Sequence, residues 1–267
     1  MERREFIKYA ALTGLLGRKV WAKPSRLELD QADLAHYDFI LARVRFADQT
    51  QGTDHWQAKP GGDANLLEAL SKVARCRTKP IPNTHNWTPK IAHDGQFNAI
   101  VSFDESERLK NFPFLFMTGE SRFCLNRSQQ NHLRDYLQGG GFLLMDDCMA
   151  QPNTDYFFQS SVQLMQTVFG PEAVRPIPLD HEIFHNVYDL GQMGLPFCNG
   201  VERGAYGVFM GERVAALLSS HDIHCGWCDK TNSTFKGTYQ PSRGIGPHQH
   251  QHAIRAGINI IMYAISH

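Results

Sequence analysis

A dense set of side chains that could bind a metal lies between residues 219 and 251. Cys225 and Cys228 form a Cys-x-x-Cys pair, which places two thiolates on one small turn and suits tetrahedral zinc or another soft transition metal. Three histidines alternate further on, at His248, His250 and His252. In an extended segment two of them would point the same way and could complete a Cys₂His₂ site. The sequence therefore predicts a divalent metal site in this segment.

The same two cysteines fit two other interpretations. Cys-Gly-Trp-Cys resembles the dithiol of thioredoxin-like proteins, but that chemistry needs a thiolate at a helix N-terminus, and residues 229–237 show no apolar helical stripe. In an oxidising compartment the pair could instead form a structural disulfide. Trp227 lies between the two cysteines and would either line a ligand pocket or fill the core.

A second group of polar side chains follows the apolar runs that we expect to be strands. Asp146, Asp147 and Cys148 come directly after residues 142–145, and Glu120 holds the same place after the preceding run. Ligands of open α/β sheets bind at the carboxyl ends of the strands. Adjacent carboxylates there could bind a cation or raise each other's pKa for acid–base catalysis. Alternatively, they cap the next helix and hold turns.

His181 and His185 are four residues apart. On a helix they would share one face, as two ligands of one metal often do. Pro176 and Pro178 precede them, and no zinc-protease motif surrounds them. We expect His181 to contribute to the site, and the alternative is that both histidines are structural.

The elements that must position these residues are strands and helices in alternation. Short continuous apolar runs are typical of strands covered on both faces. Strands are expected at residues 39–46, 97–103, 114–118, 142–145, 208–210 and 214–218. Helices are expected to begin at the caps Asp63, Ser128 and Asp155 and near Ala253. Residues 114–145 form a strand–helix–strand unit, which implies a right-handed crossover and a parallel sheet.

Six ordered blocks of the chain are Ala42–Phe46, Asn111–Gly119, Leu137–Cys148, Asp180–Phe184, Asp222–Trp227 and Arg255–Asn259. Together they resemble a bacterial family called domain of unknown function 4159. This resemblance implies a doubly wound, mostly parallel α/β fold, similar to class I glutamine amidotransferases and flavodoxin-like proteins. It implies no agreed activity. The chain departs from the family pattern at Cys228, where we would expect Glu, and at Glu182, where we would expect Pro. No cysteine follows residues 114–118, so amidotransferase chemistry is not expected.

Residues 1–22 resemble a twin-arginine export signal. Arg3-Arg4-Glu5-Phe6-Ile7-Lys8 is followed by a weakly apolar stretch, two basic residues and the small-residue cleavage site Val20-Trp21-Ala22. The resemblance implies that the twin-arginine translocation machinery carries the folded protein to the periplasm, often around a metal or cofactor. The alternative is an ordinary basic N-terminus. We expect a single α/β domain over residues 23–267, with a long His/Cys-rich loop at residues 219–251.

Composition excludes two classes of function. The chain has 27 basic and 27 acidic residues, and 22 and 25 of these remain without residues 1–22. With no basic run, there is no electrostatic footprint for nucleic acid. No later segment is long and apolar enough for a stable membrane span. A hydrophobic content of 42% suits a packed core.

These patterns predict an exported α/β protein that binds a metal or small ligand at the carboxyl edge of its sheet. As a metal-assisted hydrolase, it would use Asp146 or Asp147 as general base while the metal polarises substrate or water. Alternatively, it is a catalytically inactive, amidotransferase-like module with a structural disulfide that captures a small molecule or periplasmic partner. The remaining residues expected to line the site are Glu120, Cys148, His181, Asp222 and Trp227. The expected metal ligands are Cys225, Cys228, His248, His250 and His252.

Overall fold

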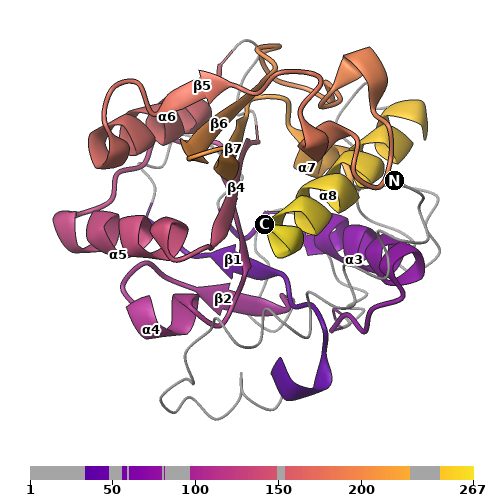
Figure 1. Cartoon of the computed structure of the whole chain (residues 1–267), viewed down its shortest axis with the longest axis horizontal. Helices are drawn as coiled ribbons and strands as arrows, with labels where there is room; N and C mark the ends of the chain where they lie inside the picture. Colours follow the sequence, from indigo (N-terminus) through magenta and orange to yellow (C-terminus); the bar gives the residue numbers. More distant parts are fainter. Residues whose placement is uncertain are drawn as a thin grey trace.

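The computed structural model describes residues 34–47, 56–58, 60–79, 81, 97–148, 154–228 and 247–267. The predicted export signal at residues 1–22 lies outside the described residues, as does most of the predicted loop, at residues 229–246. The described chain forms three layers, with a central sheet between two layers of helices (Figure 1).

The sheet is mixed and mostly parallel. In chain order its strands are β1 (Ala42–Val44), β2 (Ala99–Val101), β3 (Phe114–Gly119), β4 (Phe142–Asp147), β5 (Val174–Pro176), β6 (Ala205–Met210) and β7 (Arg213–Ser219). Their spatial order is β2-β1-β3-β4-β7-β6-β5. The first five in this order are parallel, whereas β6 runs antiparallel to both β7 and β5. The predicted strands are confirmed, those at residues 208–210 and 214–218 pair as the antiparallel β6–β7 hairpin, and β5 was not predicted.

Helices cover both faces of this sheet. The longer ones are α3 (Pro60–Ala74), α5 (Arg127–Gln138), α6 (Tyr156–Phe169) and α8 (Pro247–Ser266). The short ones are α4 (Ser106–Leu109), α7 (Ile223–Gly226) and the 3₁₀ turns η2 (Glu182–Phe184) and η3 (Gly191–Met193). Helices α3 and α8 pack on one face, and α5 and α6 on the other (Figure 1). No helix in the described part of the chain is long and apolar enough to cross a membrane.

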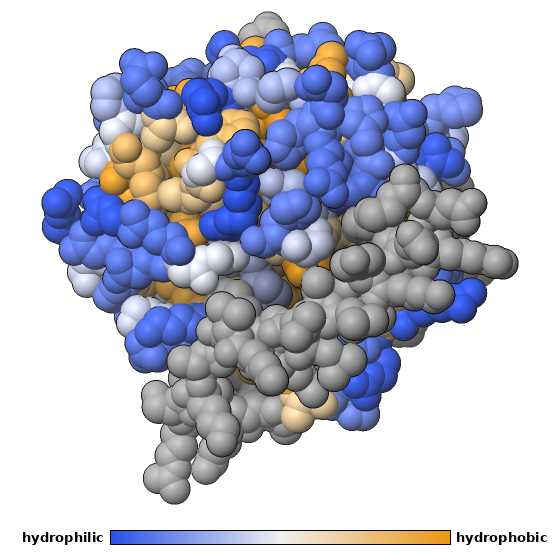
Figure 2. Space-filling model, viewed as in Figure 1, coloured by the Kyte–Doolittle hydropathy of each residue, from blue (hydrophilic) through white to orange (hydrophobic). Residues whose placement is uncertain are grey.

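Alternation along the central strands divides the core into two clusters. Phe116 and Leu144 point toward α3 and α8, whereas Met117 and Met145 point toward α5 and α6. Strands that bury both faces must be apolar throughout, which explains the continuous hydrophobic runs of β3 and β4. In the face shown in Figure 2, hydrophilic residues cover most of the described surface, and hydrophobic residues show between them beside α6.

Three predicted helix starts are wrong. Helix α3 begins three residues before Asp63, whose carboxylate is used elsewhere. Asn126, not Ser128, caps α5, in a reciprocal pair of hydrogen bonds with Gln129. Helix α8 begins at Pro247, six residues before Ala253. The three histidines of this segment therefore lie on a helix and not on the extended segment that was predicted.

Candidate functional site

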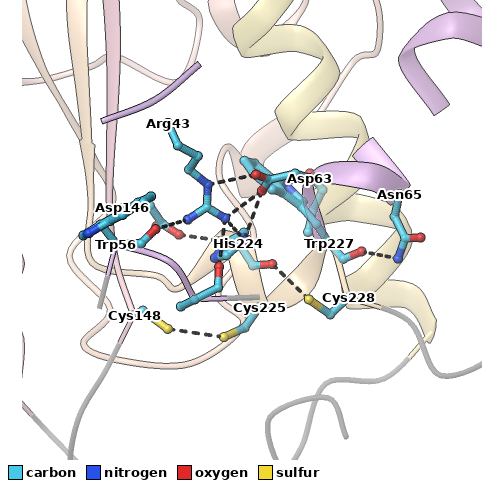
Figure 3. Close-up of polar contacts among 12 residues, drawn as sticks. Arg43, Trp56, Asp63, Asn65, Asp146, Cys148, His224, Cys225, Trp227 and Cys228 are labelled. Carbon is cyan, nitrogen blue, oxygen red and sulfur yellow. Dashed lines mark hydrogen bonds and ion pairs between the residues drawn. The ribbon is translucent and has the colours of Figure 1, made fainter. Parts of the chain in front are cut away.

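Two parallel strands, β4 and β7, end beside the short helix α7. Asp146 is in register with Ser219, so the chain leaves both strands at the carboxyl edge of the sheet. Cys148 follows β4, while Asp222 and Cys225 follow β7. Side chains 77 residues apart in sequence therefore come into contact (Figure 3). These residues therefore lie at the carboxyl edge of the sheet, where ligands of open α/β folds bind.

Cys148, Asp222 and Cys225 form a compact group of potential metal ligands. The Sγ atoms of Cys148 and Cys225 are 3.8 Å apart, and the ligand atoms of all three residues lie within 4.8 Å of one another. All three side chains are buried. Asp222 has a left-handed backbone with φ of 53°, which turns the chain sharply between β7 and α7. The group offers two sulfurs and one carboxylate, a donor set that suits a soft divalent ion.

The ligands predicted from the sequence only partly coincide with this group. Cys225 belongs to it, but the Sγ atom of Cys228 lies 3.8 Å from the carbonyl oxygen of His224. A Cβ atom on Gly62 would lie 3.2 Å from that sulfur, so Cys228 faces α3 rather than β4. Among the described residues, no group of three possible ligands contains Cys228.

The histidines of α8 point to other parts of the chain. His250 contacts the carbonyl oxygen of Gly226 through Nδ1 at 2.8 Å, and His252 contacts that of Gly194 through Nε2 at 3.1 Å. His248 is exposed. Within a helix, alternate residues point about 200° apart. In the described chain these histidines do not join Cys225 in a group of ligands.

Asp146 and Asp147 point to opposite faces of the sheet, because successive residues of a strand alternate. Oδ2 of Asp146 accepts a hydrogen bond from the His224 amide in α7 at 2.9 Å. Oδ2 of Asp147 accepts one from the Phe158 amide in the first turn of α6 at 2.7 Å. The two carboxylates therefore bind helices on opposite faces of the sheet. The side chain of Asp147 caps α6, a role that was predicted for Asp155.

Burial dominates the electrostatics of both carboxyl groups. It raises the pKa of Asp146 to about 7. The pKa of Asp147 is raised well above its usual range by burial and by the neighbouring charges of Asp146, Asp155 and Glu120. The Oδ1 atoms of Asp146 and Asp147 have no hydrogen-bond partner among the described residues. Glu120 is buried and lies close enough to Asp147 to affect its charge.

Trp227 fills the core behind α7. Its side chain is fully buried, its ring lies 5.1 Å from that of Phe116, and its Nε1 donates to the carbonyl oxygen of Ala253 at 3.1 Å. Of the two interpretations of Trp227, the structure favours the core residue.

His181 lies away from the carboxyl edge. Its ring packs against Tyr263 and Phe209, and Tyr263 contacts Phe142 at the start of β4. The structure therefore places His181 toward the amino edge of the sheet, where its Nδ1 accepts a hydrogen bond from the Ile183 amide. It is not brought together with Asp146 or Cys225.

Sequence reasoning missed the polar network that fixes α7. Arg43, only 1% exposed, donates from Nε and Nη2 to the two carboxylate oxygens of Asp63, both at 2.8 Å. The Nη2 atom also lies 2.8 Å from Nε2 of His224. A further bond reaches the carbonyl oxygen of Trp56 (Figure 3). Another reaches the carbonyl oxygen of Ala58. The network ties β1, residues 56–58 and α3 to the turn that carries Asp222 and Cys225.

Burial and the charge of Arg43 both act on the pKa values of its two partners, Asp63 and His224. Burial alone would raise the pKa of Asp63, but the charge of Arg43 and hydrogen bonds from His224 and Arg43 outweigh it and lower that pKa. Burial and the charge of Arg43 lower the pKa of His224. The signal for this network was an arginine within the apolar run 39–46, because a buried charge requires a partner.

None of the six cysteines of the chain, all of which lie among the described residues, forms a disulfide in this structure. Cys148, Cys198, Cys225 and Cys228 are buried, whereas Cys124 is exposed. Cys225 and Cys228 are therefore not joined in the disulfide that was one of the interpretations of their spacing.

Comparison with known proteins identifies a family. No curated protein sequence matches the chain. Residues 40–265 match the family described as Domain of unknown function (DUF4159), a range that includes Arg43, the strands and helices of the sheet, and the group of Cys148, Asp222 and Cys225. The chain therefore belongs to the DUF4159 family, as its ordered blocks predicted.

Proposed function

We propose that this protein binds a divalent transition metal, with zinc the best match, through Cys148, Asp222 and Cys225. The distance between the two sulfurs carries the proposal. Two thiolates that each bind one tetrahedral zinc ion at about 2.3 Å have sulfurs about 3.8 Å apart. The Cys148 and Cys225 sulfurs are separated by 3.8 Å.

The three protein ligands would leave one coordination position of the metal open for a reaction. Three protein ligands on a tetrahedral ion leave one position for water or substrate, the arrangement of catalytic zinc sites. A metal bound there would supply Lewis-acid polarisation of that fourth ligand. Asp146 of β4, two residues before Cys148 and hydrogen-bonded to the His224 amide of α7, is the carboxyl group that we assign to accept a proton. We therefore propose metal-assisted hydrolysis, with Asp146 as general base.

The burial of the same residues supports a second candidate function. Cys148, Asp222 and Cys225 are each at most 1% exposed, as expected for a metal that only holds α7 against β4. Glu120 and Ser121, not a cysteine, follow β3. In this alternative the domain is a catalytically inactive, flavodoxin-like or amidotransferase-like module that binds a small molecule or a periplasmic partner.

Export by the twin-arginine translocation machinery is part of the proposal. It rests on the residues Arg3-Arg4-Glu5-Phe6-Ile7-Lys8. A pathway that carries folded proteins suits a site whose ligands meet only in the folded chain. Replacing Arg3 and Arg4 with Lys should retain the full-length protein in the cytoplasm on cell fractionation. Periplasmic protein in that variant would contradict this route.

The metal is tested by elemental analysis of the purified full chain and of three variants. We expect near-stoichiometric metal in the wild type and in Cys228→Ser, and its loss in Cys148→Ser and Cys225→Ser. Cys228 is the matched control, because it is a buried thiol on the same turn but faces away from the group. Loss of metal in Cys228→Ser with retention in Cys148→Ser would contradict the proposed ligands. Folded wild type that binds neither zinc nor cobalt would contradict metal binding altogether.

A separate measurement distinguishes the two functions. Asp146→Asn should keep the metal but lose hydrolytic activity toward a panel of ester, amide and phosphoester substrates. If the wild type is inactive on the panel while it binds metal stoichiometrically, the structural role is favoured.

A further inference from the structure

The contact between Cys148 and Cys225 has a second chemical use besides metal binding. The two thiols come from β4 and α7, are separated by 77 residues in sequence, and lie 3.8 Å apart. The distance between sulfurs in a disulfide is about 2.05 Å, so the pair must approach by about 1.8 Å to form a covalent bond. Both groups are buried, and α7 is one helical turn at the end of β7.

The neighbouring thiols are less well placed. Cys228 is three residues from Cys225, but its sulfur contacts the His224 carbonyl oxygen and faces Gly62 of α3. Cys198 packs against the backbone of the same turn, since a Cβ on Gly226 would lie 2.5 Å from its sulfur. Among the described residues, Cys148 and Cys225 are the two cysteines whose sulfurs lie within hydrogen-bonding distance of each other.

We infer that Cys148 and Cys225 are an oxidative modification site, which a peroxide converts to a disulfide between the end of β4 and α7 when no metal is bound. The sequence pattern would assign such a bond to Cys225 and Cys228. The structure instead assigns Cys225 a partner from a different strand.

The reaction is balanced with hydrogen peroxide as oxidant. One thiolate attacks a peroxide oxygen, the O–O bond breaks, and the products are a sulfenic acid and one water after proton transfer. The second thiolate attacks the sulfenic sulfur, the S–O bond breaks, and the leaving hydroxide takes a proton to become the second water. The two thiols lose two electrons and two protons in total, and the peroxide is reduced to two waters.

The modification would regulate the proposed metal site, and this consequence rests on the proposed function. Both sulfurs are needed as thiolates to bind the metal, so the disulfide and the metal exclude each other. Metal-loaded protein should therefore resist oxidation, and oxidised protein should not take up metal until it is reduced. The cross-link itself does not depend on metal binding.

The experiment uses the full chain, stripped of metal with a chelator and exposed to hydrogen peroxide under native conditions. Thiols are then counted after unfolding, and cross-linked peptides are identified by mass spectrometry without reduction. In the wild type we expect Cys148 and Cys225 to be lost as thiols, in addition to the exposed Cys124, and to be found joined by a bond. Cys228→Ser and Cys198→Ser should form the same bond, whereas Cys148→Ser should not.

Three outcomes would overturn the inference. They are a bond between Cys225 and Cys228, a bond that uses Cys198, or Cys148 and Cys225 still present as thiols in folded protein after treatment that fully oxidises the exposed Cys124 in a mass-spectrometric control. A second measurement repeats the oxidation after zinc is added. If the cross-link forms equally with and without zinc, the proposed metal binding is contradicted while the modification site stands.

Discussion

Arg43 of β1 and Asp63 of α3 form a two-bond ion pair in the interior, with Nε–Oδ2 and Nη2–Oδ1 distances of 2.8 Å. Both side chains are 1% exposed. Parallel hydrogen bonds of this kind fix orientation as well as distance. The remaining donors of Arg43 reach residues 56–58 and His224, so the pair sets the position of α7 relative to the sheet.

Asp63→Asn should destabilise the protein by about 3–5 kcal/mol, because it leaves the Arg43 charge buried without its counterion. Asp38→Asn is the matched control, since Asp38 pairs with Arg77 at 3.0 Å but both side chains are exposed. We expect the control to change stability far less, because exposed ion pairs contribute little. Urea unfolding of both variants measures the difference. Equal losses of unfolding free energy in the two variants would show that burial of the Arg43–Asp63 pair does not increase its contribution to stability.

The same pair predicts a dependence of stability on acid. The pKa of Asp63 in the folded protein lies below its ordinary value of 3.8. Below that value the unfolded chain binds more protons than the folded one, so stability falls as pH falls. The contribution of Asp63 is fully present above pH 3.8 and is lost as pH decreases through the lower folded pKa. The difference in unfolding free energy between wild type and Asp63→Asn should therefore shrink in acid. A difference that is constant with pH would contradict the shift.

Asp147 should tolerate Asn but not Ala. Its Oδ2 caps α6 by accepting from the Phe158 amide, and the amide oxygen of Asn can do the same. Since burial and neighbouring charges disfavour the ionised form, loss of the charge costs little. We expect Asp147→Asn to be at least as stable as the wild type at pH 7, and Asp147→Ala to lose about 1 kcal/mol. Thermal unfolding distinguishes them, and equal losses in both variants would exclude the cap.

Metal removal should lower the thermal stability of the wild type. A ligand at 100 times its dissociation constant stabilises the folded state by about 2.7 kcal/mol. Cys148→Ser should show no such dependence on added zinc, whereas Cys228→Ser should behave like the wild type. Scans with zinc and with chelator provide the measurement. A shift that persists in Cys148→Ser would indicate ions bound elsewhere.

The parallel part of the fold was predictable because buried strands leave a simple pattern. Strands β3 and β4 are continuous apolar runs. Because one helical pattern lies between them in sequence, the two strands were predicted to be parallel and joined by a helical crossover. Strand β5 was missed because Val174-Arg175-Pro176 is short, mostly exposed and contains proline. The start of α8 could have been found, since Pro247 stands at the first helical position, where proline is favoured.

The candidate site was predictable strand by strand but not as a whole. A polar residue after an apolar run indicates the carboxyl edge of a sheet. This rule identified Asp146 and Cys148 as candidate site residues. It does not say that β7 lies beside β4 while β5, the next strand along the chain, lies at the far edge. Local spacing therefore suggested Cys228 as the partner of Cys225. Cys228 lies beyond the end of α7 and its sulfur faces α3, so the contact of Cys225 is with Cys148.

The adjacency of β4 and β7 also sets an order for folding. Between Cys148 and Cys225 the chain passes through α6, β5 and the β6–β7 hairpin. Contacts across 77 residues carry a large loop-closure entropy and form slowly compared with local ones. The contact of His224 with Arg43 spans 181 residues and imposes the same requirement. We therefore expect the site to be among the last parts of the protein to assemble, so that its presence would mark a chain that has finished folding.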